Sequence, residues 1–192
     1  EKGEFDFQKE YWKKELKDCD MDLRLSDSPG ADPDDLFGGG RVCFRVGKEL
    51  NDRINRIGRK YTVTPFSFLL AAFRALLYRY TGQEDMVVVV PVQGRNEREA
   101  EALIGCFLNM LPIRNRLNAG ESFIECVKRE NRKVLDALEH QDIPFGPILK
   151  EMDIRSESIR TSVYHIVFSY EGNVMKNVAL GNFEVEFDEL SL

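Results

Sequence analysis

The sequence has only two histidines, and histidine is the side chain that most often serves as a general base near neutral pH. His140 stands two positions before Asp142 at the expected end of a helix. Residues at i and i+2 of a helix do not face each other, so this pair is a poor general-base dyad, and we expect His140 to cap or tie the helix end. His165 lies in an expected strand on the same face as Val167 and Ser169. That face could line a polar cavity or be half exposed to solvent, and both interpretations stay open.

Other catalytic and ligand-binding patterns are missing from the sequence. It contains no GxSxG, HExxH or P-loop motif, and the glycines at 38–40 are not followed by Lys and Ser or Thr, which argues against nucleotide binding. Four cysteines, at positions 19, 43, 106 and 126, form no CxxC pair and no Cys/His cluster. We therefore expect reduced thiols that mostly fill the core, and no metal site.

Charge and hydropathy exclude several classes of partner. The 192 residues fit one domain or one large lobe, and 33 acidic against 27 basic residues give a net charge of −6, which argues against nucleic acid and anionic lipid as ligands. The longest stretch without charge, residues 61–73, is 13 residues long, whereas a membrane span needs about 20. We expect a cytoplasmic protein. Because the chain opens on Glu1 without a signal-peptide pattern, we also expect it to be a piece of a longer polypeptide.

Helices alternate with strands along the chain, which predicts an α/β layer structure. Apolar spacing predicts helices at about 7–17, 48–60, 66–80 and 123–139 and a short one from 145. The helix at 66–80 is apolar on nearly every side, with Arg74 and Arg79 as interruptions. The β-branched run Met86–Val90 is typical of a strand covered on both faces. Further strands are expected at 41–46, 110–117, 162–170 and 183–190, with Pro112 favouring a sheet edge or a bulge.

Two ordered motifs give a more specific indication. Residues 104–114, Ile-Gly-Cys-Phe-Leu-Asn-Met-Leu-Pro-Ile-Arg, resemble the (I/V)GxFVNT…R motif of condensation domains from nonribosomal peptide synthetases. Residues 140–145, His-Gln-Asp-Ile-Pro-Phe, resemble the HQDxPF motif of the same family. Flanking segments agree, and the resemblance extends from about Tyr11 to Tyr170.

The resemblance implies a fold and a reaction. It implies a mixed-sheet α/β sandwich like one lobe of the chloramphenicol-acetyltransferase-like acyltransferase fold, in which two lobes form a V around a tunnel. Phosphopantetheine arms of donor and acceptor carrier proteins enter that tunnel, and the acceptor amine attacks the donor thioester to form an amide. No cofactor is expected to be bound covalently to this chain, since carrier proteins present the phosphopantetheine.

One departure from the family defines what this chain is expected to be. The HHxxxDG motif, which lies in the N-terminal lobe of the family, is missing from residues 1–192. The chain therefore looks like the C-terminal lobe alone and is predicted to be inactive by itself. Its expected partners are the N-terminal lobe, peptidyl and aminoacyl carrier proteins and an adjacent adenylation domain, and the isolated lobe is expected to self-associate. The family's RDxSRNPL segment keeps only Arg160 convincingly, which leaves the subtype open.

The resemblance also implies three substrate-binding residues. Asn109 matches the Asn of the first motif near the tunnel, where its amide could bind a substrate carbonyl or the pantetheine arm; the alternative is a buried Asn that fixes the turn before Met110. Arg95 could interact with a carboxylate of the other lobe, or it could be an arginine in a surface turn. His165 falls where the family strand often carries Gln, which would place it on the tunnel wall. For His140, the resemblance strengthens the structural role.

Two other functions stay open. The chain could be a degenerate, non-catalytic module that binds a carrier protein or another synthetase domain, as the weak match around Arg160 suggests. It could also belong to a related acyltransferase that makes an ester instead of an amide.

Overall fold

The structure, a computed structural model, describes residues 2–19, 23, 25, 40–95, 98–100, 102–118, 120–151 and 166–171. All five predicted helices form. The elements are α1 (Lys2–Glu15), α2 (Lys48–Tyr61), α3 (Pro65–Thr81), β1 (Asp85–Val92), the 3-10 helix η1 (Arg98–Ala100), β2 (Asn109–Arg116), α4 (Phe123–Leu138) and α5 (Phe145–Glu151).

Local sequence signals fix where the longer helices begin. The Thr64 hydroxyl accepts a 3.0 Å hydrogen bond from the Ser67 amide at the start of α3, and Pro65 occupies the first turn. Ser122 and Glu125 form a capping box at the start of α4. Both signals are visible in the sequence, which is why these helix starts could be predicted.

The sheet in the described part of the chain is mixed. β1 and β2 pair antiparallel from Asp85 opposite Arg116 to Val92 opposite Asn109. On the other edge of β1, Val89 forms a parallel bridge with Val167: the Val89 amide donates to the Ile166 carbonyl at 3.0 Å, and the Phe168 amide donates to the Val89 carbonyl at 2.9 Å. Within the described residues β2 has no second neighbour, as Pro112 predicted.

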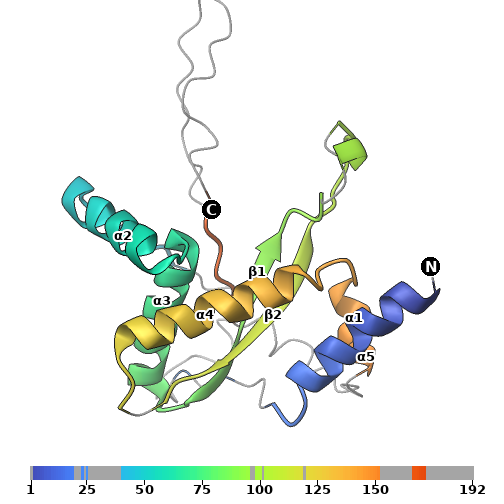
Figure 1. Ribbon diagram of the computed structural model, residues 1–192, viewed down its shortest axis with the longest axis horizontal. Helices are drawn as coiled ribbons and strands as arrows, with labels where there is room; N and C mark the ends of the chain where they lie inside the picture. The colour runs from blue at the N-terminus through green and yellow to red at the C-terminus, as the bar shows by residue number, and fades with distance from the viewer. Residues whose placement is uncertain are drawn as a thin grey trace, which may run out of the picture.

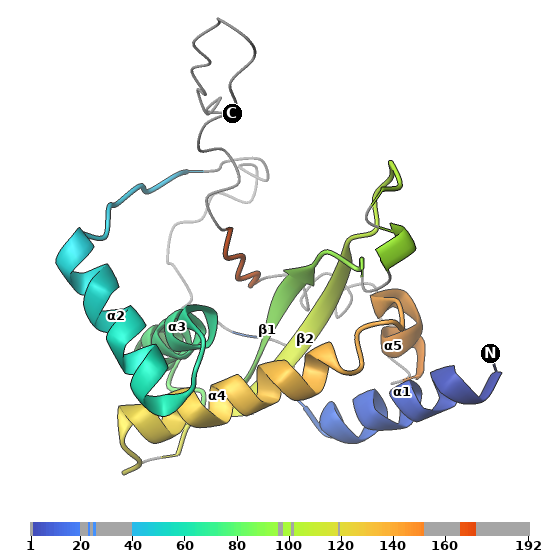
Figure 2. The same cartoon turned by 45° about the horizontal axis from the view of Figure 1, so that its top comes forward.

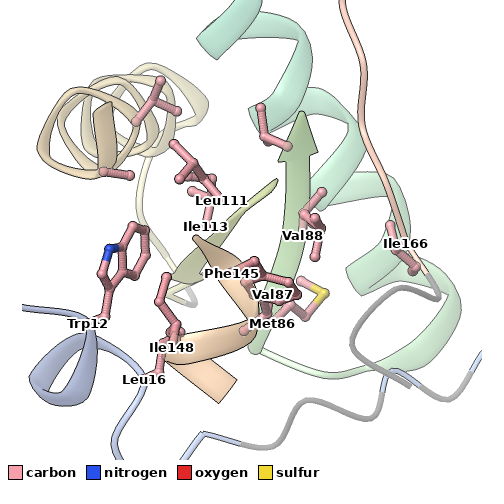
Figure 3. Close-up of a cluster of buried hydrophobic side chains, with 14 of the residues drawn as sticks. Trp12, Leu16, Met86, Val87, Val88, Leu111, Ile113, Phe145, Ile148 and Ile166 are labelled. Carbon is pink, nitrogen blue, oxygen red and sulfur yellow. The ribbon is translucent and has the colours of Figure 1, made fainter. Parts of the chain in front are cut away.

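The helices cover the β1–β2 ladder and enclose the core. α4 runs across the ladder with α3 beside it, and α1 and α5 lie next to each other beyond β2 (Figures 1 and 2). The run from Met86 to Val90 is buried throughout, as predicted. Trp12 of α1 and Leu16, the residue after α1, pack with Phe145 and Ile148 of α5 into the same core (Figure 3).

Two expectations about the chain are wrong. Residues 41–46 form no strand, and Val42 and Phe44 are 90% and 86% exposed, because an alternating segment becomes a strand only where a neighbour supplies hydrogen bonds. The cysteines do not mostly fill the core: Cys126 is buried, whereas Cys43 and Cys106 are exposed. Of the expected strand at 162–170, only the part from residue 166 is described, and the one at 183–190 lies outside the described residues.

No single helix in the described ranges is long and apolar enough to cross a membrane. α2 and α3 pass the length and composition test only as a pair, and they are bent by 107° relative to each other.

Candidate functional site

His140 lies buried in the loop between α4 and α5. Its Nδ1 is 2.7 Å from the carbonyl oxygen of Asp136, so Nδ1 carries the proton and donates, since a carbonyl can only accept. The His140 carbonyl accepts a 2.8 Å hydrogen bond from Nε1 of Trp12. The Tyr11 ring stacks on the imidazole with 3.8 Å between the ring centroids. These contacts confirm that His140 ties the end of α4, here to α1.

Asp142 binds a side chain of α1. Its Oδ2 accepts a 3.0 Å hydrogen bond from Nε2 of Gln8, whose Oε1 in turn accepts from the Ile143 amide at 2.9 Å. Sequence reasoning missed Gln8, which is buried in α1. The available signal was its spacing, because Gln8 stands three and four positions before Tyr11 and Trp12 and so shares their helix face.

Asn109, the first residue of β2, binds the same loop. Its Nδ2 donates to the carbonyls of Gln141 at 2.7 Å and Ile143 at 2.9 Å. Its Oδ1 accepts from the amides of Met110 at 2.9 Å and Phe145 at 3.2 Å. Both donors and both acceptor positions of the amide are therefore engaged with the backbone. These contacts favour the turn-fixing alternative, and a role in substrate binding stays a prediction.

The two sequence motifs thus meet in one assembly, which we call the motif junction: Asn109 together with residues 140–145. An apolar cavity of about 210 Å³ lies against the half of the ladder that runs from Ile113 to the pair of Val92 and Asn109. Its lining includes Phe66, Val90, Val92, Leu111, Leu138 and Tyr170. The cavity borders the motif junction through Val92, which pairs with Asn109, and through Leu138, two residues before His140; the residues of the junction are not part of its lining.

Arg95 organises the connection between β1 and β2. Its guanidinium donates to the carbonyls of Ala100, Leu103 at 2.8 Å and Gly105 at 3.0 Å. The guanidinium carbon also lies 4.4 Å from the centre of the Phe107 ring, a cation–π contact. Arg95 therefore holds this connection together. The contact of Arg95 with a carboxylate of another lobe stays a prediction.

The same connection presents apolar side chains to solvent. It projects from the layered body of the chain together with η1 (Figures 1 and 2). Gly94 precedes Arg95 with φ of +62°, and a Cβ there would overlap the Phe107 carbonyl oxygen, so only glycine fits. Ile104 is fully exposed, and Leu103 and Leu108 are more than half exposed. We call residues 102–108 the apolar connection.

Arg74 and Glu130 form a fully buried ion pair that sequence reasoning missed. Arg74 donates from Nε at 2.9 Å and from Nη2 at 3.0 Å to the two carboxylate oxygens of Glu130. It also donates to the carbonyls of Met86 and Ile113, and Asn115 Nδ2 donates to Glu130 at 2.6 Å. The signal was the position of Arg74 in an otherwise apolar helix. The cluster joins α3, α4, β1 and β2 and is closed to substrate by its burial.

Asp85 and Cys126, both outside the motif junction, are among the groups with shifted pKa values. Hydrogen bonds from Arg114 lower the pKa of Asp85, with Arg114 Nε 2.9 Å from Oδ1. Burial raises the pKa of the Cys126 thiol to about 11, which keeps it protonated at neutral pH. In the described ranges no group of His, Cys, Asp and Glu could hold a metal ion. His165 lies outside the described residues, so its place on a tunnel wall stays a prediction.

Comparison with known proteins gives consistent matches. The chain matches the family model described as Condensation domain over residues 1–191. It is 32% identical over 182 residues to a linear gramicidin synthase protein of Brevibacillus parabrevis, a match that covers 95% of this chain and 4% of that protein. It is also 32% identical over 154 residues to tyrocidine synthase 3 of the same organism, which covers 80% of this chain and 2% of that protein.

Solved structures agree with this assignment. The X-domain from teicoplanin biosynthesis superposes with a TM-score of 0.74 at 25% identity, over 85% of this chain and 36% of that one. A complex of the X-domain and OxyB from teicoplanin biosynthesis gives a TM-score of 0.69 at 25% identity, over 78% of this chain and 33% of that one. The chain therefore spans only part of each of these proteins. With its two motifs joined at Asn109 and a family match over almost its whole length, this chain belongs to the condensation-domain family.

Proposed function

We propose that this chain is the C-terminal lobe of a nonribosomal peptide synthetase condensation domain and forms one wall of its reaction tunnel. In the reaction, an amine carried by one carrier protein attacks the thioester carbonyl carried by another. The C–N bond forms, the C–S bond breaks, the amine loses a proton and the carrier thiol is released. The motif junction is the observation that carries the proposal, because it brings both family motifs together beside an apolar cavity.

The apolar connection is the surface that we assign to the N-terminal lobe. Exposed Leu103, Ile104 and Leu108 lie in a connection that the hydrogen bonds of Arg95 hold in place, so they form a preorganised apolar contact. The N-terminal lobe would supply the HHxxxDG motif that residues 1–192 do not contain. Carrier proteins would present phosphopantetheine, and an adenylation domain would stand next to the condensation domain.

The test compares the chain alone with the chain joined to an N-terminal lobe that contains HHxxxDG. Both are given an aminoacyl carrier and an acyl carrier, and amide product is measured by mass spectrometry. We expect no product above the uncatalysed rate from the chain alone and turnover from the joined protein. Equal turnover by the chain alone would contradict the proposal. Offering a hydroxyl acceptor in parallel distinguishes an ester-forming enzyme.

A second function, a non-catalytic binding module, is favoured by one comparison. The X-domain, a structural neighbour at 25% identity, has been solved in a complex with OxyB, another protein. If this chain acts in the same way, the full polypeptide that carries it should bind a partner protein or carrier without forming an amide. The binding-module hypothesis would be rejected if the full polypeptide forms an amide and if this activity is lost when the second histidine of its HHxxxDG motif is replaced.

A further inference from the structure

The backbone of Ile143 is bound by side-chain amides from two different elements. Its amide donates a 2.9 Å hydrogen bond to Oε1 of Gln8 in α1, and its carbonyl accepts a 2.9 Å hydrogen bond from Nδ2 of Asn109 in β2. Ile143 is 1% exposed and Gln8 is 5% exposed. Ile143 therefore joins α1 to the first residue of β2.

Gln8 holds the loop between α4 and α5 at a second point. Its Nε2 donates at 3.0 Å to Oδ2 of Asp142, so the oxygen and the nitrogen of its amide group both contact the loop. Trp12, one helical turn further along α1, donates to the His140 carbonyl. α1 therefore fixes residues 140–145 from one side, while Asn109 fixes them from the other.

The place of this loop matters for the proposed reaction because of what adjoins Asn109. Asn109 follows directly on the apolar connection, which we assign to the contact with the N-terminal lobe. It also pairs with Val92, which lines the apolar cavity. The place of Ile143 therefore helps to set the geometry of both surfaces. A misplacement of about 1 Å that originates far from the reacting atoms can cost an enzyme about 10²-fold in rate.

We propose that Gln8 is a positioning residue for the condensation reaction. It is buried and acts through the 140–145 loop, which it holds against the start of β2. This role rests on the proposed function, because it requires that the chain forms one wall of the reaction tunnel. It gives α1, which contains neither of the two family motifs, a part in the reaction.

Exchanging the chemical groups of Gln8 and Asp142 tests this role. In Gln8→Glu a carboxylate replaces the donor and faces the Asp142 carboxylate, so two like charges repel each other. In the double variant Gln8→Glu/Asp142→Asn, the carboxylate at position 8 accepts from the Ile143 amide and from the new amide at position 142, so both hydrogen bonds are kept. Asp142→Asn alone measures what the other interactions of Asp142 contribute.

The measurement is kcat and KM for amide formation by the joined protein, at a temperature at which thermal unfolding shows every variant to be folded. We expect Gln8→Glu to lower kcat at least about tenfold and to change KM for either carrier by less than about threefold. The double variant should recover to within about threefold of Asp142→Asn. A residue that only adds stability would leave kcat per folded molecule unchanged.

Lys13→Gln is the matched control. It changes the charge of α1 by the same one unit as Gln8→Glu, at an exposed position, and should leave kcat unchanged. Hydrogen exchange of the Ile143 amide is a second readout, which Gln8→Glu should accelerate and the double variant should restore. If Gln8→Glu does not fold, Gln8→Met takes its place; it has a similar size and removes both hydrogen bonds, so it should lower kcat without recovery by Asp142→Asn.

The outcomes distinguish this role of Gln8 from the proposed function. If the unchanged joined protein forms no amide, the proposed function is wrong and the role of Gln8 falls with it. If the unchanged protein is active and Gln8→Glu has a normal kcat, the role of Gln8 alone is overturned. A loss that the double variant does not recover would also overturn it, because the effect would then not depend on the contact with Asp142.

Discussion

Asn109 is the residue whose replacement should affect folding most directly at the motif junction. Asn109→Ala removes the hydrogen bonds of the Asn109 amide to the carbonyls of Gln141 and Ile143 and to the Phe145 amide, and each buried group that this leaves unsatisfied costs about 1–3 kcal/mol. We expect a total loss of about 2–4 kcal/mol in the free energy of unfolding, measured by urea denaturation. Asn51→Ala, at an exposed position of α2, is the control and should change stability little.

The same variant separates the two roles of Asn109. A structural residue lowers the fraction of folded enzyme, whereas a substrate-binding residue lowers turnover per folded molecule. Normal stability of Asn109→Ala combined with a large loss of turnover in the joined protein would therefore support substrate binding and contradict our expectation.

Asp85 gives a prediction about pH. Hydrogen bonds from Arg114 lower its pKa in the folded state, so the ion pair adds stability that is fully present above the unfolded pKa of about 4. That stability is lost as the pH falls through the folded pKa. In urea denaturation at pH 6 and pH 3, Asp85→Asn should lose less stability on acidification than the unchanged chain. Because the pair is partly exposed, 0.5 M salt should shrink the difference, and identical pH profiles would contradict the prediction.

At the scale of elements, the sequence predicted where helices lie better than what holds them together. Apolar spacing and caps are local, so α2, α3 and α4 could be found from neighbouring residues. The pairing of Arg74 with Glu130 joins residues 56 positions apart and depends on how α3 and α4 cross the sheet, which no local pattern encodes. The strand predicted at 41–46 was wrong for the same reason, since strand formation depends on a distant neighbour.

Gly94 provides a test of the connection between β1 and β2. Gly94→Ala should destabilise the chain for two reasons: residue 94 has a left-handed backbone conformation, and the added Cβ would overlap the Phe107 carbonyl oxygen. Gly120→Ala is a matched control, with φ of +88° and no atom within 4 Å of the added Cβ, so it should lose only about 1–2 kcal/mol for its backbone conformation. Thermal unfolding should show the larger loss for Gly94→Ala, and equal losses would mean that the close approach relaxes without cost.

At the scale of the whole molecule, the family was predictable and the contacts of its motifs were not. The order and spacing of residues 104–114 and 140–145 indicated a condensation domain, which the family match over residues 1–191 confirms. The sequence left Asn109 with two open roles, because a side-chain amide suits a substrate and a backbone turn equally well. Only the position of the 140–145 loop beside β2 shows which groups this amide contacts.

The apolar connection predicts how the isolated chain behaves. With Ile104 and its neighbours exposed, the chain should self-associate, and its sedimentation coefficient should rise with protein concentration. Ile104→Lys should reduce this rise, whereas Leu135→Lys, which adds the same charge on α4, should not. A concentration-independent monomer, or an equal effect of the two variants, would argue against the connection as the contact surface.

The three hydrogen bonds that join Asn109 to residues 141–145 also have a mechanical consequence. A partner that pushes on residues 141–145 must either break these bonds or move the start of β2 with the loop. Since β2 continues into the ladder with β1, a displacement at this surface loop would reach the central strands as a rigid movement, and the loop cannot act as an independently swinging cover.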